Sequence, residues 1–174
     1  FEPDARASAE AFVPSLAQLA GERVLAVDDN AASREVTGRM LERLGMVPTV
    51  LASGAECLTE LRRQPDGSEY SLALLDLRMP DMDGLEVARC IRGDPTHGAL
   101  PIVIMTAFGG RDERAAAAKI GVQAFLAKPI RLEELGNACA EALAGERWPD
   151  TAAGAAGRPA AAAEWGLEGA RILL

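Results

Sequence analysis

The sequence predicts an α/β fold in which a single parallel sheet is covered by helices on both faces. Between residues 21 and 145, five short apolar runs alternate with five amphipathic helical patterns. Most of the runs are apolar throughout, which is typical of strands that are buried on both faces of a sheet. Strands that alternate with helices pair in parallel, because each helix supplies the crossover connection. We therefore expect one doubly wound, three-layer α/β/α domain over residues 21–145.

The first half of this region contains three predicted strands and two helices. The first strand, at 23–27, ends in the acidic run Asp28-Asp29-Asn30. The helix after it ends at Gly45 and places four apolar residues on one face, namely Val36, Met40, Leu41 and Leu44. The remaining elements are a strand at 47–51, a helix capped by Ser53 and a strand at 72–76.

The second half repeats the pattern with further helical and apolar runs. Pro101 opens a strand, Gly121 ends an Ala-rich helix, and Lys128-Pro129 ends the last strand. The predicted elements are a helix at 84–92, a strand at 102–105, a helix at 111–120, a strand at 124–127 and a helix at 132–143.

Polar side chains stand at the carboxyl ends of the predicted strands. In open α/β sheets the functional site lies beyond these ends, where the order of the strands reverses. We therefore expect a cluster there, and its members are Asp28, Asp29, Asp76, Thr106 and Lys128.

The acidic members of this cluster favour a hard divalent cation. Three carboxylates at one edge of a sheet repel each other unless a cation lies among them, and Mg²⁺ prefers oxygen ligands. Asp29 and Asp76 can supply ligands directly, and Asp28 can hold a metal-bound water. A carboxylate that faces a Mg²⁺-bound phosphoryl group is also a competent nucleophile, and it forms an acyl phosphate. Thr106 and Lys128 would then complement the phosphoryl oxygens by a hydrogen bond and by charge.

Four short motifs, each at the end of a predicted strand, resemble the receiver domain of two-component response regulators. They are Asp28-Asp29-Asn30, Asp76-Leu77-Arg78-Met79-Pro80 with Asp83-Gly84, Met105-Thr106-Ala107 and Lys128-Pro129. Each motif alone is a modest signal, whereas all four in this order are specific. The resemblance covers about residues 23–143, and it implies the CheY-like (flavodoxin-like) strand order 2-1-3-4-5.

The resemblance implies a phosphoacceptor and a metal site. Asp76 accepts a phosphoryl group from a phosphohistidine on a partner kinase or phosphotransfer domain. Asp29, Asp76 and the backbone carbonyl of Arg78 bind Mg²⁺, and Asp28 assists through a water molecule.

The resemblance also implies a switch. Thr106 moves toward the phosphoryl group, Lys128 pairs with it, and the peptide bond before Pro129 is cis. The aromatic residue that fills the space vacated by Thr106 is here Phe125, which has no hydroxyl for partners to recognise; simple core packing is the alternative role for this ring.

Two positions that tune phosphoryl loss in the family are Arg78 and Phe108. A long cation and a bulky aromatic at the mouth of the site obstruct an attacking water, so we expect slow loss of the phosphoryl group. Gly109-Gly110 makes the following loop permissive.

Other functions fit the sequence less well. A phosphohydrolase of the haloacid-dehalogenase type usually has a second Asp two residues after its nucleophile, where this chain has Arg78. A flavodoxin-like cofactor binder would need a phosphate-binding loop rich in Ser, Thr and Gly after the first strand. A receiver-like domain that has lost phosphorylation and works as an interaction module stays open as an alternative, although no required residue is missing.

The flanking segments suggest a larger parent protein. Residues 1–20 and 146–168 have the composition of linkers, and residues 169–174 repeat the pattern of residues 21–26, as if a second receiver domain began there. Together with Ala31-Ala32-Ser33-Arg34-Glu35 and Thr106-Ala107-Phe108-Gly109, this resembles hybrid sensor histidine kinases. A stand-alone response regulator is the alternative. The chain begins with Phe1 rather than Met, so we expect a piece of a longer protein.

Composition excludes some classes of partner. The net charge of -8 argues against direct binding of nucleic acid, which needs clustered Lys and Arg. No apolar run approaches the roughly 20 residues needed to span a bilayer, so we expect no membrane contact by this fragment, although its parent can be membrane-anchored. Three scattered cysteines fit small core residues in a reducing cytoplasm. The family also allows dimerisation through the face of the helix at 111–120.

Overall fold

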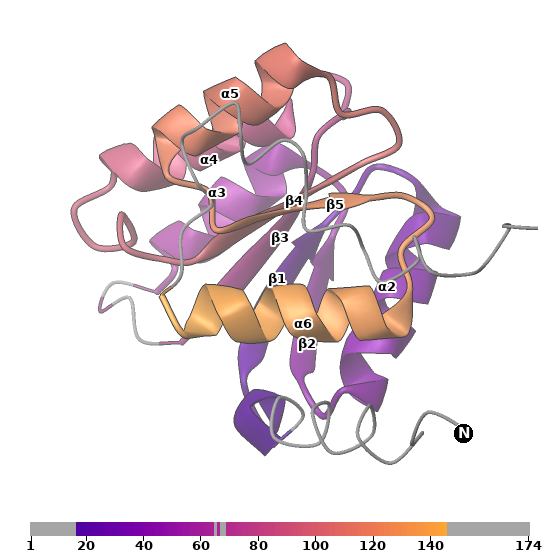
Figure 1. Ribbon diagram of the computed structural model, residues 1–174. Helices are drawn as coiled ribbons and strands as arrows, with labels where there is room; N and C mark the ends of the chain where they lie inside the picture. The colour runs from indigo at the N-terminus through magenta and orange to yellow at the C-terminus, as the bar shows by residue number, and fades with distance from the viewer. Residues whose placement is uncertain (1–16, 65, 67–68, 146–174) are drawn as a thin grey trace, which may run out of the picture.

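The computed structural model describes residues 17–64, 66 and 69–145 (Figure 1). The five strands form one parallel sheet in the order β2-β1-β3-β4-β5, which confirms the predicted fold class and strand order. The strands are β1 (Arg23–Val27), β2 (Val47–Leu51), β3 (Leu72–Asp76), β4 (Ile102–Thr106) and β5 (Ala124–Ala127). The helices are α2 (Ala31–Arg43), α3 (Gly54–Arg62), α4 (Gly84–Gly93), α5 (Arg111–Ile120) and α6 (Leu132–Leu143).

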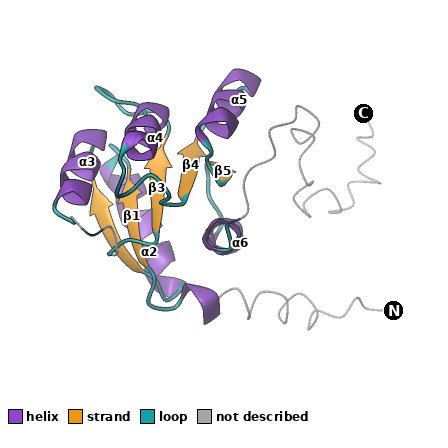
Figure 2. Ribbon diagram, turned by 90° about the vertical axis from the view of Figure 1, so that its left-hand side faces the viewer, coloured by secondary structure: helices purple, strands orange, loops and turns teal. Residues whose placement is uncertain are grey.

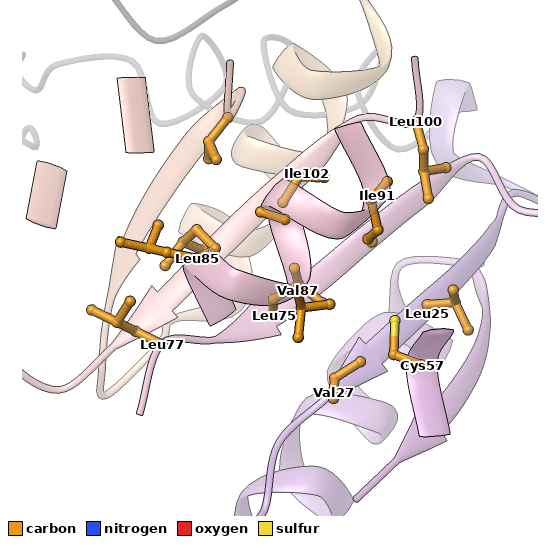
Figure 3. Close-up of a cluster of buried hydrophobic side chains, with 14 of the residues drawn as sticks. Leu25, Val27, Cys57, Leu75, Leu77, Leu85, Val87, Ile91, Leu100 and Ile102 are labelled. Atoms are coloured by element: carbon orange, nitrogen blue, oxygen red, sulfur yellow. The ribbon is translucent and has the colours of Figure 1, made fainter. Parts of the chain in front are cut away.

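The sheet separates two hydrophobic cores, because successive side chains of a strand point to opposite faces. Leu25 and Val27 of β1 pack with α3, α4 and α5 on one side, a core that Figure 3 shows in close-up. Val24 and Ala26 of the same strand pack with α2 and α6 on the other side. Figure 2 shows the resulting layers, with α3, α4 and α5 on one face of the sheet and α6 on the other.

The central strands and the edge strand differ in burial. Every residue of β3 and β4 is buried, including the charged Asp76 at the end of β3. In contrast, Val47 and Val50 of the edge strand β2 are 48% and 45% exposed. The expectation of strands buried on both faces therefore holds for the centre of the sheet and fails at the β2 edge, where one side has no neighbouring strand.

One detail of the predicted face of α2 is wrong. Val36 is 53% exposed, whereas Thr37 and Leu41 are the buried residues of this helix. The buried face of α2 begins one position later than predicted, because the β-branched Thr37 occupies the core position that the apolar pattern assigned to Val36.

Helix α5 is weakly anchored in comparison with α6. Ala117 is the one residue of α5 that is buried, whereas six residues of α6 are buried. Gly121 ends α5 with a φ of 81°, in the left-handed conformation that glycine adopts without a steric penalty. Helix α5 therefore packs on the sheet through a small apolar contact.

The ordered domain begins before the predicted boundary at residue 21. Leu19 is fully buried in the core beneath α2 and α6, and the N–H of Gly21 donates to the carbonyl of Gly45 at 2.8 Å. The end of the predicted linker 1–20 therefore belongs to the domain. Residues 1–16, the predicted linker 146–168 and the predicted start of a second domain at 169–174 lie outside the described residues.

Two of the three cysteines behave as predicted core residues. Cys57 and Cys139 are buried, and burial raises the pKa of each thiol to about 12; Cys90, in contrast, is exposed. Within the described residues, no helix combines the length and the apolar character needed to cross a bilayer.

A pair of glycines in α4 tests how tightly this helix packs on the end of β3. A Cβ atom at Gly84 would lie 2.5 Å from the carbonyl oxygen of Asp76, whereas one at Gly93 would meet no atom within 4 Å. We expect Gly84→Ala to lower the free energy of unfolding by about 1–3 kcal/mol, the range for overpacking. Gly93→Ala should raise it by about 0.5–1 kcal/mol through helix propensity. Urea denaturation measures both, and equal effects of the two variants would contradict the packing argument.

Candidate phosphorylation site

Three carboxylates gather where β1 and β3 end. Oxygen atoms of Asp28, Asp29 and Asp76 lie within 4.8 Å of one another. Asp28 and Asp76 are 2% and 5% exposed, and Asp29 is exposed. The strands β1 and β3 are neighbours in the sheet, and the chain leaves them toward opposite faces, to α2 and α4. This is the point of reversed strand order at which open α/β sheets form a crevice.

Lys128 follows β5 and reaches the carboxylates across the end of β4. Its Nζ lies 2.6 Å from Oδ2 of Asp28 and 2.7 Å from Oδ1 of Asp76. The backbone N–H of Lys128 donates to the carbonyl of Thr106 at 2.7 Å, which ties the end of β5 to the end of β4. The Lys128–Pro129 peptide bond is cis, the isomer that the resemblance implies.

Asp28 is the most fully hydrogen-bonded of the three carboxylates. Its Oδ1 accepts from the N–H of Asn30 at 2.9 Å, and its Oδ2 accepts from Ser33 Oγ at 2.5 Å as well as from Lys128. The side chain of Asp29 makes no hydrogen bond or ion pair with the described residues. Its carboxylate is therefore free to bind a cation.

Two residues of the first turn of α2 belong to this site, and no motif in the sequence predicted their contacts. Ser33 contacts Asp28 as described, and Arg34 donates to the backbone carbonyls of Asp28 and Asp29 at 2.8 and 2.9 Å. The available signal was their position, four to six residues after the acidic pair, because Asn30 caps α2 and so directs this turn toward the end of β1.

Thr106 is buried, and its hydroxyl is engaged within its own loop. The Oγ1 atom donates to the carbonyl of Phe108 at 2.9 Å and accepts from the N–H of Phe108 at 3.1 Å. The side chain of Phe108 is 81% exposed. A movement of the Thr106 hydroxyl toward Asp76 would thus have to break this local turn.

Phe125 is buried against the same loop. A Cβ atom on Gly109 would lie 2.6 Å from the Phe125 ring, so a larger residue at this position would require the ring or the loop to shift. The Arg114 guanidinium lies 5.1 Å from the centroid of the ring. Gly109 therefore has a packing role in addition to the permissive backbone that the sequence suggested.

Arg78 follows Asp76 by two residues and is held by a residue that sequence reasoning missed. Its guanidinium forms an ion pair with Oε1 of Glu113 in the first turn of α5, while Oε2 of Glu113 accepts from the N–H of Gly110 at 3.0 Å. The Arg78 side chain remains 69% exposed. The ion pair connects the loop after β3 with the start of α5, although an exposed pair of this kind adds little stability.

The charges of the cluster shift two pKa values. Burial raises the pKa of Asp76 above its ordinary value of 3.8; Lys128 opposes this shift, and the negative charges of Asp28 and Asp29 add to it. Burial by itself would lower the pKa of Lys128, but its hydrogen bonds to Asp28 and Asp76 and their charges outweigh burial and raise it above 10.5. At neutral pH the lysine is a cation, and the ionised form of Asp76 is less stable than that of an ordinary aspartate.

The raised pKa of Asp76 predicts a stabilising substitution. Because the native state binds this proton more tightly than the unfolded state, ionised Asp76 destabilises the fold, and stability falls as the pH rises from 3.8 through the native pKa. We expect Asp76→Asn to raise the Tm by several degrees at pH 7 in the absence of divalent cations. The gain should shrink toward pH 4, where wild-type Asp76 becomes protonated. Differential scanning calorimetry across this pH range checks the trend; a gain that grows on acidification would contradict it.

Comparison with known proteins identifies the family. The family model of the response regulator receiver domain matches residues 24–140. Hybrid signal transduction histidine kinase L of Dictyostelium discoideum is 35% identical over 133 residues, which are 75% of this chain and 8% of that protein. Response regulator MprA of Mycobacterium leprae is 40% identical over 114 residues, which are 65% of this chain and 47% of that protein. The chain thus spans less than half the length of these two relatives.

A solved structure agrees with this result. The receiver domain of a sensor histidine kinase from Pseudomonas aeruginosa PAO1, which has a magnesium ion in its active-site cleft, is 30% identical and superposes with a TM-score of 0.64 over 72% of this chain and 99% of that one. Since the family model extends over most of the chain and includes the ends of all the strands that carry the acidic cluster, Thr106 and Lys128, the chain belongs to the response regulator receiver domain family.

Proposed function

We propose that the chain accepts a phosphoryl group on Asp76 in a Mg²⁺-dependent reaction and changes conformation in response. The donor is a phosphohistidine on a kinase or phosphotransfer partner. The observation that carries this proposal is the placement of Lys128, whose ammonium contacts both Asp28 and Asp76, beside an unengaged Asp29. A nucleophilic carboxylate, a cation for the phosphoryl oxygens and a metal-binding carboxylate thus lie together.

The donor set fits Mg²⁺, a hard cation that prefers oxygen ligands. Asp29, Asp76 and the backbone carbonyl of Arg78 would hold the ion, and Asp28, whose remaining hydrogen-bonding capacity lies on Oδ1, would hold one of its waters. When bound, the ion neutralises charge on the phosphoryl oxygens. The magnesium ion of the Pseudomonas aeruginosa receiver domain supports this assignment.

In the transfer step, a carboxylate oxygen of Asp76 attacks phosphorus. The O–P bond of the acyl phosphate forms, the N–P bond of the phosphohistidine breaks, and its electron pair returns to the imidazole of the partner. Lys128 stabilises the negative charge of the phosphoryl oxygens, because its ammonium already lies 2.7 Å from the reacting carboxylate.

The conformational response would begin at Thr106. Its hydroxyl exchanges the bonds to Phe108 for one to the phosphoryl group, and the loop that contains Gly109 then shifts against Phe125. This loop leads directly into α5, so the face formed by α5 and β5 changes what it binds.

The parent protein is proposed to be a hybrid sensor histidine kinase, with this domain before a second receiver domain. The similarity to hybrid signal transduction histidine kinase L supports this choice. A stand-alone response regulator is the second candidate, since response regulator MprA is similar over the same region. In either case we propose a cytoplasmic domain that covers residues 21–145 and also includes the packed segment that begins at residue 17. This domain would bind protein partners and no nucleic acid. Dimerisation through α5 is a further possibility that can be tested.

Phosphorylation by a small-molecule donor tests the proposed function. With acetyl phosphate and Mg²⁺, we expect intact mass to show the gain of one phosphoryl group on the wild type and none on Asp76→Asn. Removal of Mg²⁺ with a chelator should abolish the gain. If the wild type binds Mg²⁺ and yet gains nothing, the chain is a degenerate receiver that acts through protein contacts alone.

The mouth of the site should set the lifetime of the acyl phosphate. Arg78 and Phe108 obstruct the path of an attacking water, so Arg78→Asn and Phe108→Ala should each shorten the half-life by about tenfold, a change of about 1.4 kcal/mol in the barrier. Loss of the phosphoryl group after donor removal, followed by intact mass, measures the half-life. A wild-type half-life of only seconds would contradict the proposed obstruction.

A further inference from the structure

Ser33 makes two contacts in the site that the family resemblance does not assign. Its Oγ lies 2.5 Å from Oδ2 of Asp28 and 3.3 Å from Nζ of Lys128. The backbone of Ser33 is held independently, because its N–H donates to the capping Oδ1 of Asn30 at 3.0 Å. The cap of α2 therefore places the Ser33 hydroxyl beside a buried carboxylate and a half-buried ammonium.

The hydrogen bonds of Lys128 account for all of its donors. An ammonium group has three N–H donors and no acceptor. Three oxygen atoms surround it, namely Asp28 Oδ2 at 2.6 Å, Asp76 Oδ1 at 2.7 Å and Ser33 Oγ at 3.3 Å. Ser33 supplies the one neutral acceptor of this set, and it also donates its own proton to Asp28.

Phosphorylation of Asp76 alters one of these three acceptors. When the carboxylate becomes an acyl phosphate, its oxygens lose most of their negative charge, and the charge lies on the phosphoryl oxygens. Lys128 must then redirect one N–H from Asp76 to the phosphoryl group. Asp28 and Ser33 remain as two hydrogen-bond acceptors on the side of α2. The Lys128 ammonium therefore rotates within the site and does not leave it.

We propose that Ser33 is a positioning residue for phosphoryl transfer, which holds Lys128 and the carboxylate of Asp28 in the geometry that the phosphoryl group requires. This inference rests on the proposed function. It adds an alcohol from the first turn of α2 to the acidic residues, the threonine and the lysine that stand at the strand ends.

The inference predicts that removal of one hydroxyl weakens the binding of a phosphoryl group without unfolding α2. In Ser33→Ala the backbone bond to Asn30 remains, but Asp28 loses a donor and Lys128 loses an acceptor. We expect phosphorylation by acetyl phosphate at saturating Mg²⁺ to be about tenfold slower, as for the loss of one hydrogen bond to a charged group. Binding of beryllofluoride with Mg²⁺, measured by calorimetry, should weaken by a similar factor. Ser33→Thr keeps the hydroxyl and should restore most of both quantities.

Ser53→Ala is the matched control. Ser53 is also half-buried and caps α3 by accepting from the N–H of Glu56 at 3.2 Å, but within the described residues its side chain makes no hydrogen bond to a residue of the site. This variant should lower the Tm and leave the phosphorylation rate unchanged. A rate and a beryllofluoride affinity for Ser33→Ala equal to those of the wild type would overturn the inference, and so would an equal loss of rate in Ser53→Ala.

A third readout separates this inference from the proposed function. In metal-free protein, NMR exchange of the Lys128 ammonium protons with water should be faster in Ser33→Ala than in the wild type. If the wild type takes up no phosphoryl group, the proposed function is refuted. The ammonium exchange then decides alone whether Ser33 holds Lys128. An exchange rate that is the same in Ser33→Ala and in the wild type would refute this role of Ser33.

Discussion

The pairing of the Lys128 ammonium with two buried carboxylates is the interaction on which the site depends. Asp28 follows β1, Asp76 ends β3 and Lys128 follows β5, so a single cation connects the ends of three strands across the intervening β4. Burial of two carboxylates this close together is unfavourable unless a positive charge compensates them. The sheet supplies that charge from a residue 100 positions away in the sequence.

The three acidic residues differ in environment, and their proposed roles follow from that difference. Asp28 accepts from an amide on Oδ1 and from a hydroxyl and the ammonium on Oδ2, and its one remaining acceptor position lies on Oδ1, which suits a residue that orients others and holds a metal-bound water. Asp29 is exposed and free to bind a cation. Asp76 is buried, its pKa is raised, and its one strong partner is Lys128. This environment suits a carboxylate that reacts better than one that serves only as a structural anion.

Much of the fold and most of the site could be predicted from the sequence, because both depend on local patterns. Apolar runs mark the strands, and a polar residue ends each strand that contributes to the site. The parts that could not be predicted depend on side-chain direction and on distant contacts. Ser33 is a residue type common in a first helical turn, the sequence does not show where the Arg34 guanidinium points, and the ion pair of Glu113 with Arg78 spans 35 positions.

The same reasoning explains two errors of the sequence prediction, one at the start of the domain and one within α2. The linker composition before residue 21 conceals Leu19, because one buried side chain in a short helical segment leaves no periodic signal. The exposed Val36 shows the opposite case, in which a strongly apolar residue precedes the buried Thr37 by one position.

The small buried contact between α5 and the sheet has a consequence for the free energy that signalling requires. Helix α5 buries one alanine fully and packs Ala116 and Ile120 partly against the core, so it can separate from the sheet at a free energy below that of global unfolding. Its amide protons should therefore exchange through local opening, whereas those of β3 and β4 exchange only when the whole domain opens. A local rearrangement of this size is within the reach of a few new hydrogen bonds at Asp76, so the output surface can move while the strands that hold the site remain in place.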